Sequence, residues 1–180
     1  MNTRIFPVVV CMVWLSACST SKPAPANLES SDNLEAKIAF FEKKIESHPT
    51  VAAAHAKLGG YYLQKAKETH SVDWLQKARA SVQQSIKIQP SLEAYRINAA
   101  ICGFAHQFAC AVEWGQKAVR TYSHDFVSVA ILADSYLRTG QSDLALKTLE
   151  IQGTEAENSY ELAEARAVIL AELGRLDEAR

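Results

Sequence analysis

The chain has 180 residues, with 19 Lys and Arg against 20 Asp and Glu, so its formal net charge is −1 at pH 7. This balance lacks the basic excess that holds nucleic-acid phosphates, and we expect no nucleic-acid partner. Beyond the N-terminal segment, the chain has the length of one domain. It is rich in Ala, Leu, Glu, Lys and Gln, has only seven glycines and shows no alternating apolar pattern, which predicts an all-α fold.

Residues 1–17 have the pattern of an export signal. Arg4 supplies a positive charge, and the apolar run from Ile5 to Trp14 is shorter than the roughly 20 residues that span a membrane. An ordinary cleavage site near Ala24 or Ala26 is one possibility. The other is the exit Leu-Ser-Ala-Cys18, which resembles the lipobox of bacterial lipoproteins.

The lipobox resemblance implies that Cys18 carries lipid at the mature N-terminus. Residues 18–32 are mostly Ser, Pro, Ala, Asn and Lys, a composition that cannot bury a core and predicts a flexible tether. In such lipoproteins of Gram-negative bacteria, a serine after the cysteine, here Ser19, goes with sorting to the outer membrane. The resemblance therefore implies a lipid-anchored protein of the bacterial outer membrane that faces the periplasm.

The body has an internal repeat with a period of 34 residues. Small residues recur at three sets of equivalent positions: Ala99, Ala133 and Ala167; Ala111, Ala145 and Ala179; and His106, Gly140 and Gly174, where only the first is not small. Alanines at fixed points allow two helices to approach closely, and glycine interrupts the chain between them. We therefore expect helical hairpins that stack to cover one another's apolar faces.

A helical hairpin of this period resembles the tetratricopeptide repeat. The first-helix signature is present as Leu58-Gly59-x-x-Tyr62, and the second-helix pattern is present at Ala78, Val82, Ile86 and Pro90. The resemblance implies an α-solenoid over residues 33–180: a half repeat at 33–49, repeats from about Ala52, Leu92 and Phe126, and an incomplete one from about Tyr160. About seven extra residues between Lys65 and Val72 predict a longer turn there. An unrelated helical bundle is the alternative.

No catalytic motif is present, and we expect neither an enzyme nor a cofactor. The sequence has no GxSxG, Walker, HExxH or GxGxxG pattern. Its five histidines are scattered, and Glu161 and Glu164 fit a solvated helix face better than a pair of catalytic acids.

Two cysteines, Cys102 and Cys110, lie on either side of the turn that the repeat places at His106. Since the hairpin folds one helix back on the other, the cysteines can approach as a disulfide, as two buried thiols, or as a metal site with His106. The metal site lacks a fourth protein ligand. The spacing resembles the cysteine pairs of Sel1-like repeats in exported proteins, and this resemblance implies a disulfide and no bound metal.

The first helix of each repeat lines the concave side of such a solenoid. By the repeat register, the principal lining residues are Leu63, Arg96, Ala100, Phe104, Asp134, Leu137 and Arg138, together with Ala56, Gly60, Ala130, Glu164 and Val168. Some tetratricopeptide domains hold a peptide carboxylate with Lys, Asn and Arg on this face. That set is absent here, so we expect an extended or helical protein segment as the ligand.

These features predict a non-enzymatic scaffold that assists assembly or stability of an envelope complex, such as pilus, secretion or cell-wall machinery. The alternative is an accessory subunit that recruits or regulates a periplasmic enzyme. Since the chain stops one residue after Ala179, the last repeat is predicted to expose Ala163, Ala167 and Leu170. The chain would then be a shortened product, or this end would dock on a second copy or on a partner.

Overall fold

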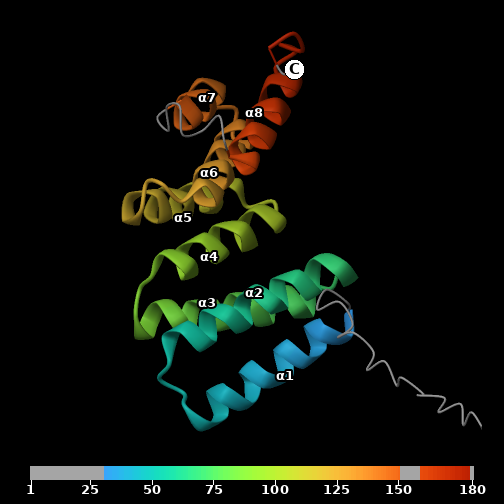
Figure 1. Cartoon of the computed structure of the whole chain (residues 1–180), viewed down its shortest axis with the longest axis vertical. Coiled ribbons are helices and arrows are strands. Elements are labelled where there is room, and N and C mark those ends of the chain that lie inside the picture. Colours follow the sequence, from blue (N-terminus) through green and yellow to red (C-terminus); the bar gives the residue numbers. More distant parts are fainter. Residues whose placement is uncertain (1–30, 151–158, 179–180) are drawn as a thin grey trace, which may run out of the picture.

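The computed structural model describes residues 31–150 and 159–178, and every regular element in them is an α-helix (Figure 1). The helices are α1 (Ser31–Ser47), α2 (Ala52–Thr69), α3 (Val72–Ile88), α4 (Leu92–Phe104), α5 (Phe108–Thr121), α6 (Phe126–Arg138), α7 (Ser142–Glu150) and α8 (Tyr160–Glu172). The predicted all-α class is confirmed. The helices α2, α4, α6 and α8 begin where the 34-residue pattern and the first-helix signature place the repeats.

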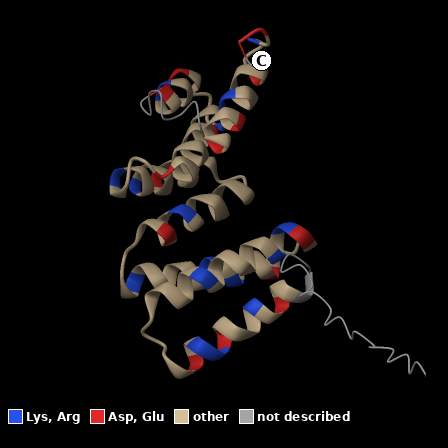
Figure 2. Cartoon of the chain, viewed as in Figure 1, with Lys and Arg blue, Asp and Glu red and all other residues tan. Residues whose placement is uncertain are grey.

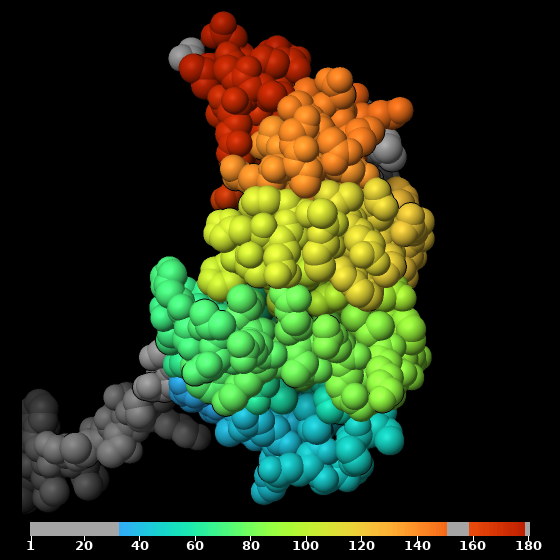
Figure 3. Space-filling model, turned by 180° about the vertical axis from the view of Figure 1, so that it is seen from behind, coloured from blue at the N-terminus to red at the C-terminus, as the bar shows by residue number. Residues whose placement is uncertain are grey.

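Successive helices form antiparallel hairpins that stack in chain order. The helices α2 and α3, α4 and α5, and α6 and α7 pack within hairpins, while α2, α4, α6 and α8 pack on one another between hairpins. The space-filling view shows the same layered order from α1 to α8 (Figure 3). The result is a helical solenoid whose first helices share one side.

Two clusters of buried side chains hold the stack together. The first joins α1 to α4 and includes Leu34, Ile38, Leu58, Val82 and Ile101. The second joins α6, α7 and α8 and includes Val129, Ala145, Leu149, Leu162 and Ile169. The repeated alanines, Ala99, Ala111, Ala133 and Ala145, are all fully buried, as expected for residues at close helix crossings.

Helix ends follow local capping chemistry. Ser91 Oγ accepts from the Ala94 N–H at 3.3 Å, and Ser159 Oγ accepts from the Leu162 N–H at 3.4 Å. The turns inside the last three hairpins use a left-handed residue, with φ of 56° at His106, 76° at Gly140 and 75° at Gly174. The histidine thus takes the backbone conformation of the glycines that it replaces in the register.

The predicted longer turn after Lys65 is wrong, because the extra residues lengthen the helices. The helices α2 and α3 have 18 and 17 residues, against 13 and 14 in α4 and α5, and only His70 and Ser71 lie between them. The inserted residues include good helix formers and no Gly or Pro, so the helix continues. The joined ends of α2 and α3 therefore project beyond α4 (Figure 1).

The last repeat differs in part from the prediction. Leu170 is 1% exposed, because α8 packs on α6 and α7, and Ala167 is partly buried, whereas Ala163 is exposed. Large exposed apolar side chains of this end include Tyr160, Val168 and Leu176, and self-association through it stays a prediction.

Several sequence features lie outside the described residues. These are the signal segment 1–17, Cys18 with nearly all of the tether, and Ala179. Within the described residues, no helix combines the length and apolar character needed to cross a membrane.

Candidate functional site

A hollow of about 560 Å³ lies on the side of the solenoid formed by the first helices. We call it the groove; it is lined by Lys67 of α2, by Ala99, Ala100, Gly103 and Phe104 of α4, by Val127, Ala130, Ile131, Asp134 and Ser135 of α6, and by Glu161, Glu164, Ala165, Val168 and Ile169 of α8. Most of these side chains are apolar and several are small. The groove therefore has an apolar floor that another chain can approach closely.

The lining repeats with the period of the sequence. Residues 34 apart occupy equivalent places in the groove: Val127 and Glu161; Ala130 and Glu164; Ile131 and Ala165; Ala100, Asp134 and Val168. Since each first helix is rotated alike within its hairpin, the same helix face points inward in every repeat. The groove is thus a direct product of the repeat register.

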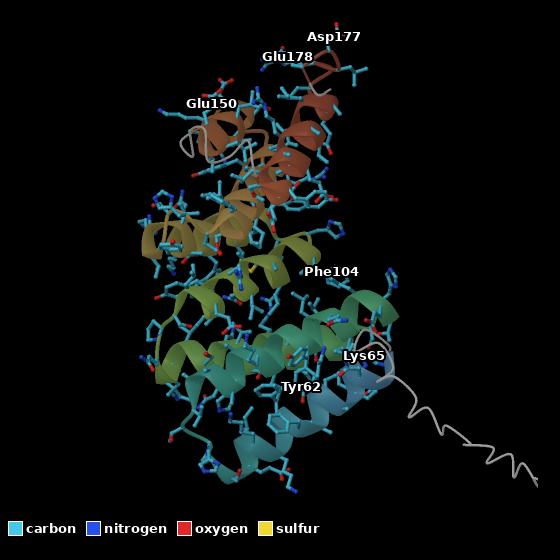
Figure 4. All side chains as sticks on the ribbon, in the orientation of Figure 1. Tyr62, Lys65, Phe104, Glu150, Asp177 and Glu178 are labelled. Atoms are coloured by element: carbon cyan, nitrogen blue, oxygen red, sulfur yellow. A yellow bond between two sulfur atoms is a disulfide. The ribbon has the colours of Figure 1, made fainter. Side chains whose placement is uncertain are left out.

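The end of the groove next to α2 depends on the added helical turn. Lys67 lies on this turn and is exposed, and it forms no ion pair with any residue of 31–150 or 159–178. By contrast, Lys65 pairs with Glu35 of α1, and this interaction raises the pKa of its ammonium group. Phe104 lies at the end of α4 on the side where α2 projects (Figure 4).

The opposite end of the groove is acidic. Glu161 accepts a hydrogen bond from the Ser159 hydroxyl at 2.9 Å; this bond and a larger contribution from a backbone N–H lower the pKa of its carboxyl group. Glu164 is exposed and has no hydrogen-bond or ion-pair partner in the described part of the chain. Asp134 lies 3.3 Å from the Arg138 guanidinium. Two carboxylates of α8 therefore face the groove with little compensating positive charge.

The structure brings Ala100, Phe104 and Asp134 together in the groove, as the sequence predicted, along with Ala130, Glu164 and Val168. The placement of two apolar residues is corrected. Leu63 is 6% exposed and belongs to the first core cluster, and Leu137 packs against the second. Both hold successive helices together, and neither is among the residues that line the groove.

The two arginines predicted on the concave face form ion pairs between repeats. The Arg96 guanidinium lies 3.0 Å from Asp125, which also caps α6 by accepting from the Ser128 N–H. Arg138 lies 3.0 Å from Glu172 of α8. These arginines therefore join neighbouring first helices and do not line the groove.

Sequence reasoning missed nine residues of the lining: Lys67, Ala99, Gly103, Val127, Ile131, Ser135, Glu161, Ala165 and Ile169. The positions of Val127 and Ile131 could have been found by taking whole helix faces in steps of 34 residues. Lys67 could not, since its place depends on the insertion continuing α2 as a helix.

The structure joins Cys102 and Cys110 in a disulfide, with their Cα atoms 5.7 Å apart. The bridge connects α4 to α5 across the His106 turn. Cys102 is 1% exposed and directly precedes Gly103, which lines the groove. Among the described residues, no group of three His, Cys, Asp or Glu is arranged to hold a metal ion. The likeness to Sel1-like repeats stays a prediction.

Charges elsewhere on the surface are mixed. Lys and Arg alternate with Asp and Glu along the described helices, without a large region of one sign (Figure 2). Among the described residues, burial and a hydrogen bond to Glu42 raise the pKa of the Tyr62 hydroxyl. It lies in the core between α1 and α2, away from the groove lining.

Comparison with known proteins gives the same class of fold and a family. The model of the ChAPs family (Chs5p-Arf1p-binding proteins) matches residues 26–161, which is more than half of the chain. The chain belongs to this family. No curated protein matches it significantly.

Solved structures of helical-repeat proteins are similar to this chain. MamA has a TM-score of 0.65 at 18% sequence identity, over 82% of this chain and 83% of that chain. YrrB, described as "a TPR protein with an unusual peptide-binding site", has a TM-score of 0.61 at 18% identity, over 85% of this chain and 74% of that chain. At this identity the similarity shows the fold, which is a tetratricopeptide-like solenoid.

Proposed function

We propose that this protein is a non-enzymatic scaffold whose groove binds a segment of another protein. One observation carries the proposal: successive first helices build an apolar hollow with charged groups at its ends. Apolar clefts with a few polar groups are the usual form of binding sites, and grooves between helices commonly take protein segments. The description of YrrB as having a peptide-binding site, and of the family as Chs5p-Arf1p-binding proteins, supports the proposal.

The proposed setting is the bacterial cell envelope. Cys18, lipidated at the end of the signal segment, anchors the protein to the outer membrane, and the tether holds the solenoid in the periplasm. There the groove captures a component of an envelope complex, such as pilus, secretion or cell-wall machinery, and stabilises it. The lipobox resemblance and Ser19 in the sequence support this part of the proposal.

The binding role is tested with valines replaced by glutamate inside and outside the groove. Val127 and Val168 line the groove and are 37% and 41% exposed, so the substitutions put charge on its floor without filling the core. Val72, at the start of α3, is 66% exposed and is not part of the groove lining, which makes Val72→Glu a matched control.

The intact lipoprotein and its variants are extracted from membranes with bound proteins. Val127→Glu with Val168→Glu is expected to lose the partner and to keep its helical circular dichroism, while Val72→Glu keeps the partner. Equal capture by all three proteins would overturn the role of the groove. A captured assembly component supports the scaffold, whereas a captured periplasmic hydrolase or cytochrome-maturation factor supports the accessory-subunit alternative.

The anchor is tested by mass spectrometry of the mature N-terminus. Stable membrane attachment needs at least two acyl chains, so Cys18 should carry several. Cys18→Ser should leave the precursor uncut. An unmodified N-terminus downstream of residue 18 would refute the anchor without affecting the groove.

A further inference from the structure

The groove has opposite charges at its two ends, and these ends are built by different repeats. Lys67 belongs to α2, while Glu161 and Glu164 belong to α8. The first helices pack in the order α2, α4, α6, α8, so α4 and α6 form the floor between the basic and the acidic end.

We propose that the groove binds a protein segment of fixed polarity: an acidic side chain beside Lys67, apolar residues over α4 and α6, and basic side chains beside Glu161 and Glu164. This inference rests on the proposed function and adds the chemistry of the partner and its direction. The occupant is a segment of another protein, because the groove is mainly apolar, carries charges of opposite sign and is lined by residues from four helices.

The absence of ion-pair partners for Lys67 and Glu164 supports the assignment. Several other charged side chains of the first helices form ion pairs between repeats: Lys57 with Glu93 at 2.8 Å, Arg96 with Asp125 at 3.0 Å, and Arg138 with Glu172 at 3.0 Å. Lys67 and Glu164 have no such partner within residues 31–150 and 159–178. Lys67 and Glu164 are therefore available to a ligand, whereas the paired charges join neighbouring repeats of the solenoid.

The floor of the groove determines which ligand side chains fit between the two charged ends. Gly103 has open space around the position of a Cβ atom, and Ala100, Ala130 and Ala165 are small, so a ligand backbone can approach. Phe104 offers an aromatic side chain at the end near α2 (Figure 4). Apolar side chains of the ligand would supply most of the affinity. Exposed ion pairs contribute little energy, so the charges at the ends set direction and selectivity.

The test is a selection of 12-residue peptides from a random display library on the folded, oxidised protein. Selected peptides that are released by Val127→Glu with Val168→Glu are taken as groove binders. They are expected to be enriched in an acidic residue toward one end and in Lys or Arg toward the other. Binding of each peptide is then measured by fluorescence anisotropy.

Charge reversal assigns each end. Glu161→Lys with Glu164→Lys should weaken these peptides roughly 3- to 30-fold and abolish the basic enrichment in a new selection. Lys67→Glu should abolish the acidic enrichment. The matched controls are Glu46→Lys and Lys43→Glu on the exposed face of α1, which should change neither.

Each outcome decides between the two proposals. Failure to select any peptide that depends on Val127 and Val168 would overturn the proposed function. Groove-dependent peptides without charge enrichment, or with an enrichment that survives its charge reversal, would overturn the polarity and leave the proposed function standing.

Discussion

Reduction of the Cys102–Cys110 disulfide should destabilise the hairpin of α4 and α5. The bridge closes a loop with a sequence separation of eight residues. The loss of loop-closure entropy in the unfolded chain then gives about 2.5 kcal/mol of stability at 25 °C. A dithiol such as dithiothreitol supplies the two electrons and two protons, leaves two cysteine thiols and is itself oxidised to a cyclic disulfide.

The assay is urea unfolding followed by circular dichroism at 222 nm, with thiols counted under denaturing conditions before and after reduction. A loss of about 2.5 kcal/mol should lower the urea midpoint by about 1–2 M. Hydrogen exchange should also speed up in the last turn of α4, which carries Gly103 and Phe104 of the groove.

The control is the Cys102→Ala, Cys110→Ala protein, whose midpoint should not respond to the reductant. Reactive thiols on both Cys102 and Cys110 in the untreated, denatured protein, counted apart from any thiol of Cys11 or Cys18, would refute the bridge itself. A bridge that is demonstrated by thiol counting but whose reduction leaves the midpoint unchanged would refute the reasoning on loop entropy.

Three further substitutions test the packing around the first core cluster. Gly59→Ala should lower the free energy of unfolding by about 1–3 kcal/mol, because the added methyl group would overlap Val82 Cγ2. Gly60→Ala has room for the methyl group and should raise the free energy of unfolding by up to about 1 kcal/mol, so equal effects of the two substitutions in urea unfolding would contradict the packing. Tyr62→Phe removes the 2.6 Å hydrogen bond to Glu42 and should cost about 1.5–3 kcal/mol at pH 7. Burial raises the pKa of the Tyr62 hydroxyl in the folded state, so the protonated hydroxyl contributes fully to the free energy of unfolding below about pH 10, and this contribution declines as the pH rises further. In urea titrations above that pH, the difference in the free energy of unfolding between Tyr62→Phe and the unmodified protein should therefore shrink.

The repeat could be predicted because small residues recur in the sequence with a fixed period. Alanines recur every 34 residues at the helix crossings, and Ala99, Ala111, Ala133 and Ala145 are fully buried in the structure, while Ala167 is partly buried. The turn residues His106, Gly140 and Gly174 all have positive φ. These features depend on local chemistry and on a fixed period, which the sequence contains.

The groove could be predicted only in part. Periodicity identifies the face of each first helix, but it does not separate residues of that face that contact the next helix, such as Leu63, from those that remain open, such as Val168. The charged end at Lys67 depends on whether an insertion forms a loop or extends a helix. The insertion continues the helix because it contains good helix formers and no Gly or Pro, whereas the burial of Leu63 and Leu170 is set by packing between hairpins.

The most direct test of the central proposal, that the groove binds a protein segment, is photo-crosslinking in living cells. A benzophenone side chain replaces Val168 in the groove or, as the control, Val72 outside it, in the full-length chain. We expect a crosslink from position 168 to a segment of another protein, lost when Val127→Glu is added, and none from position 72. A crosslink from position 72 alone, or one from position 168 that persists with Val127→Glu, would contradict it.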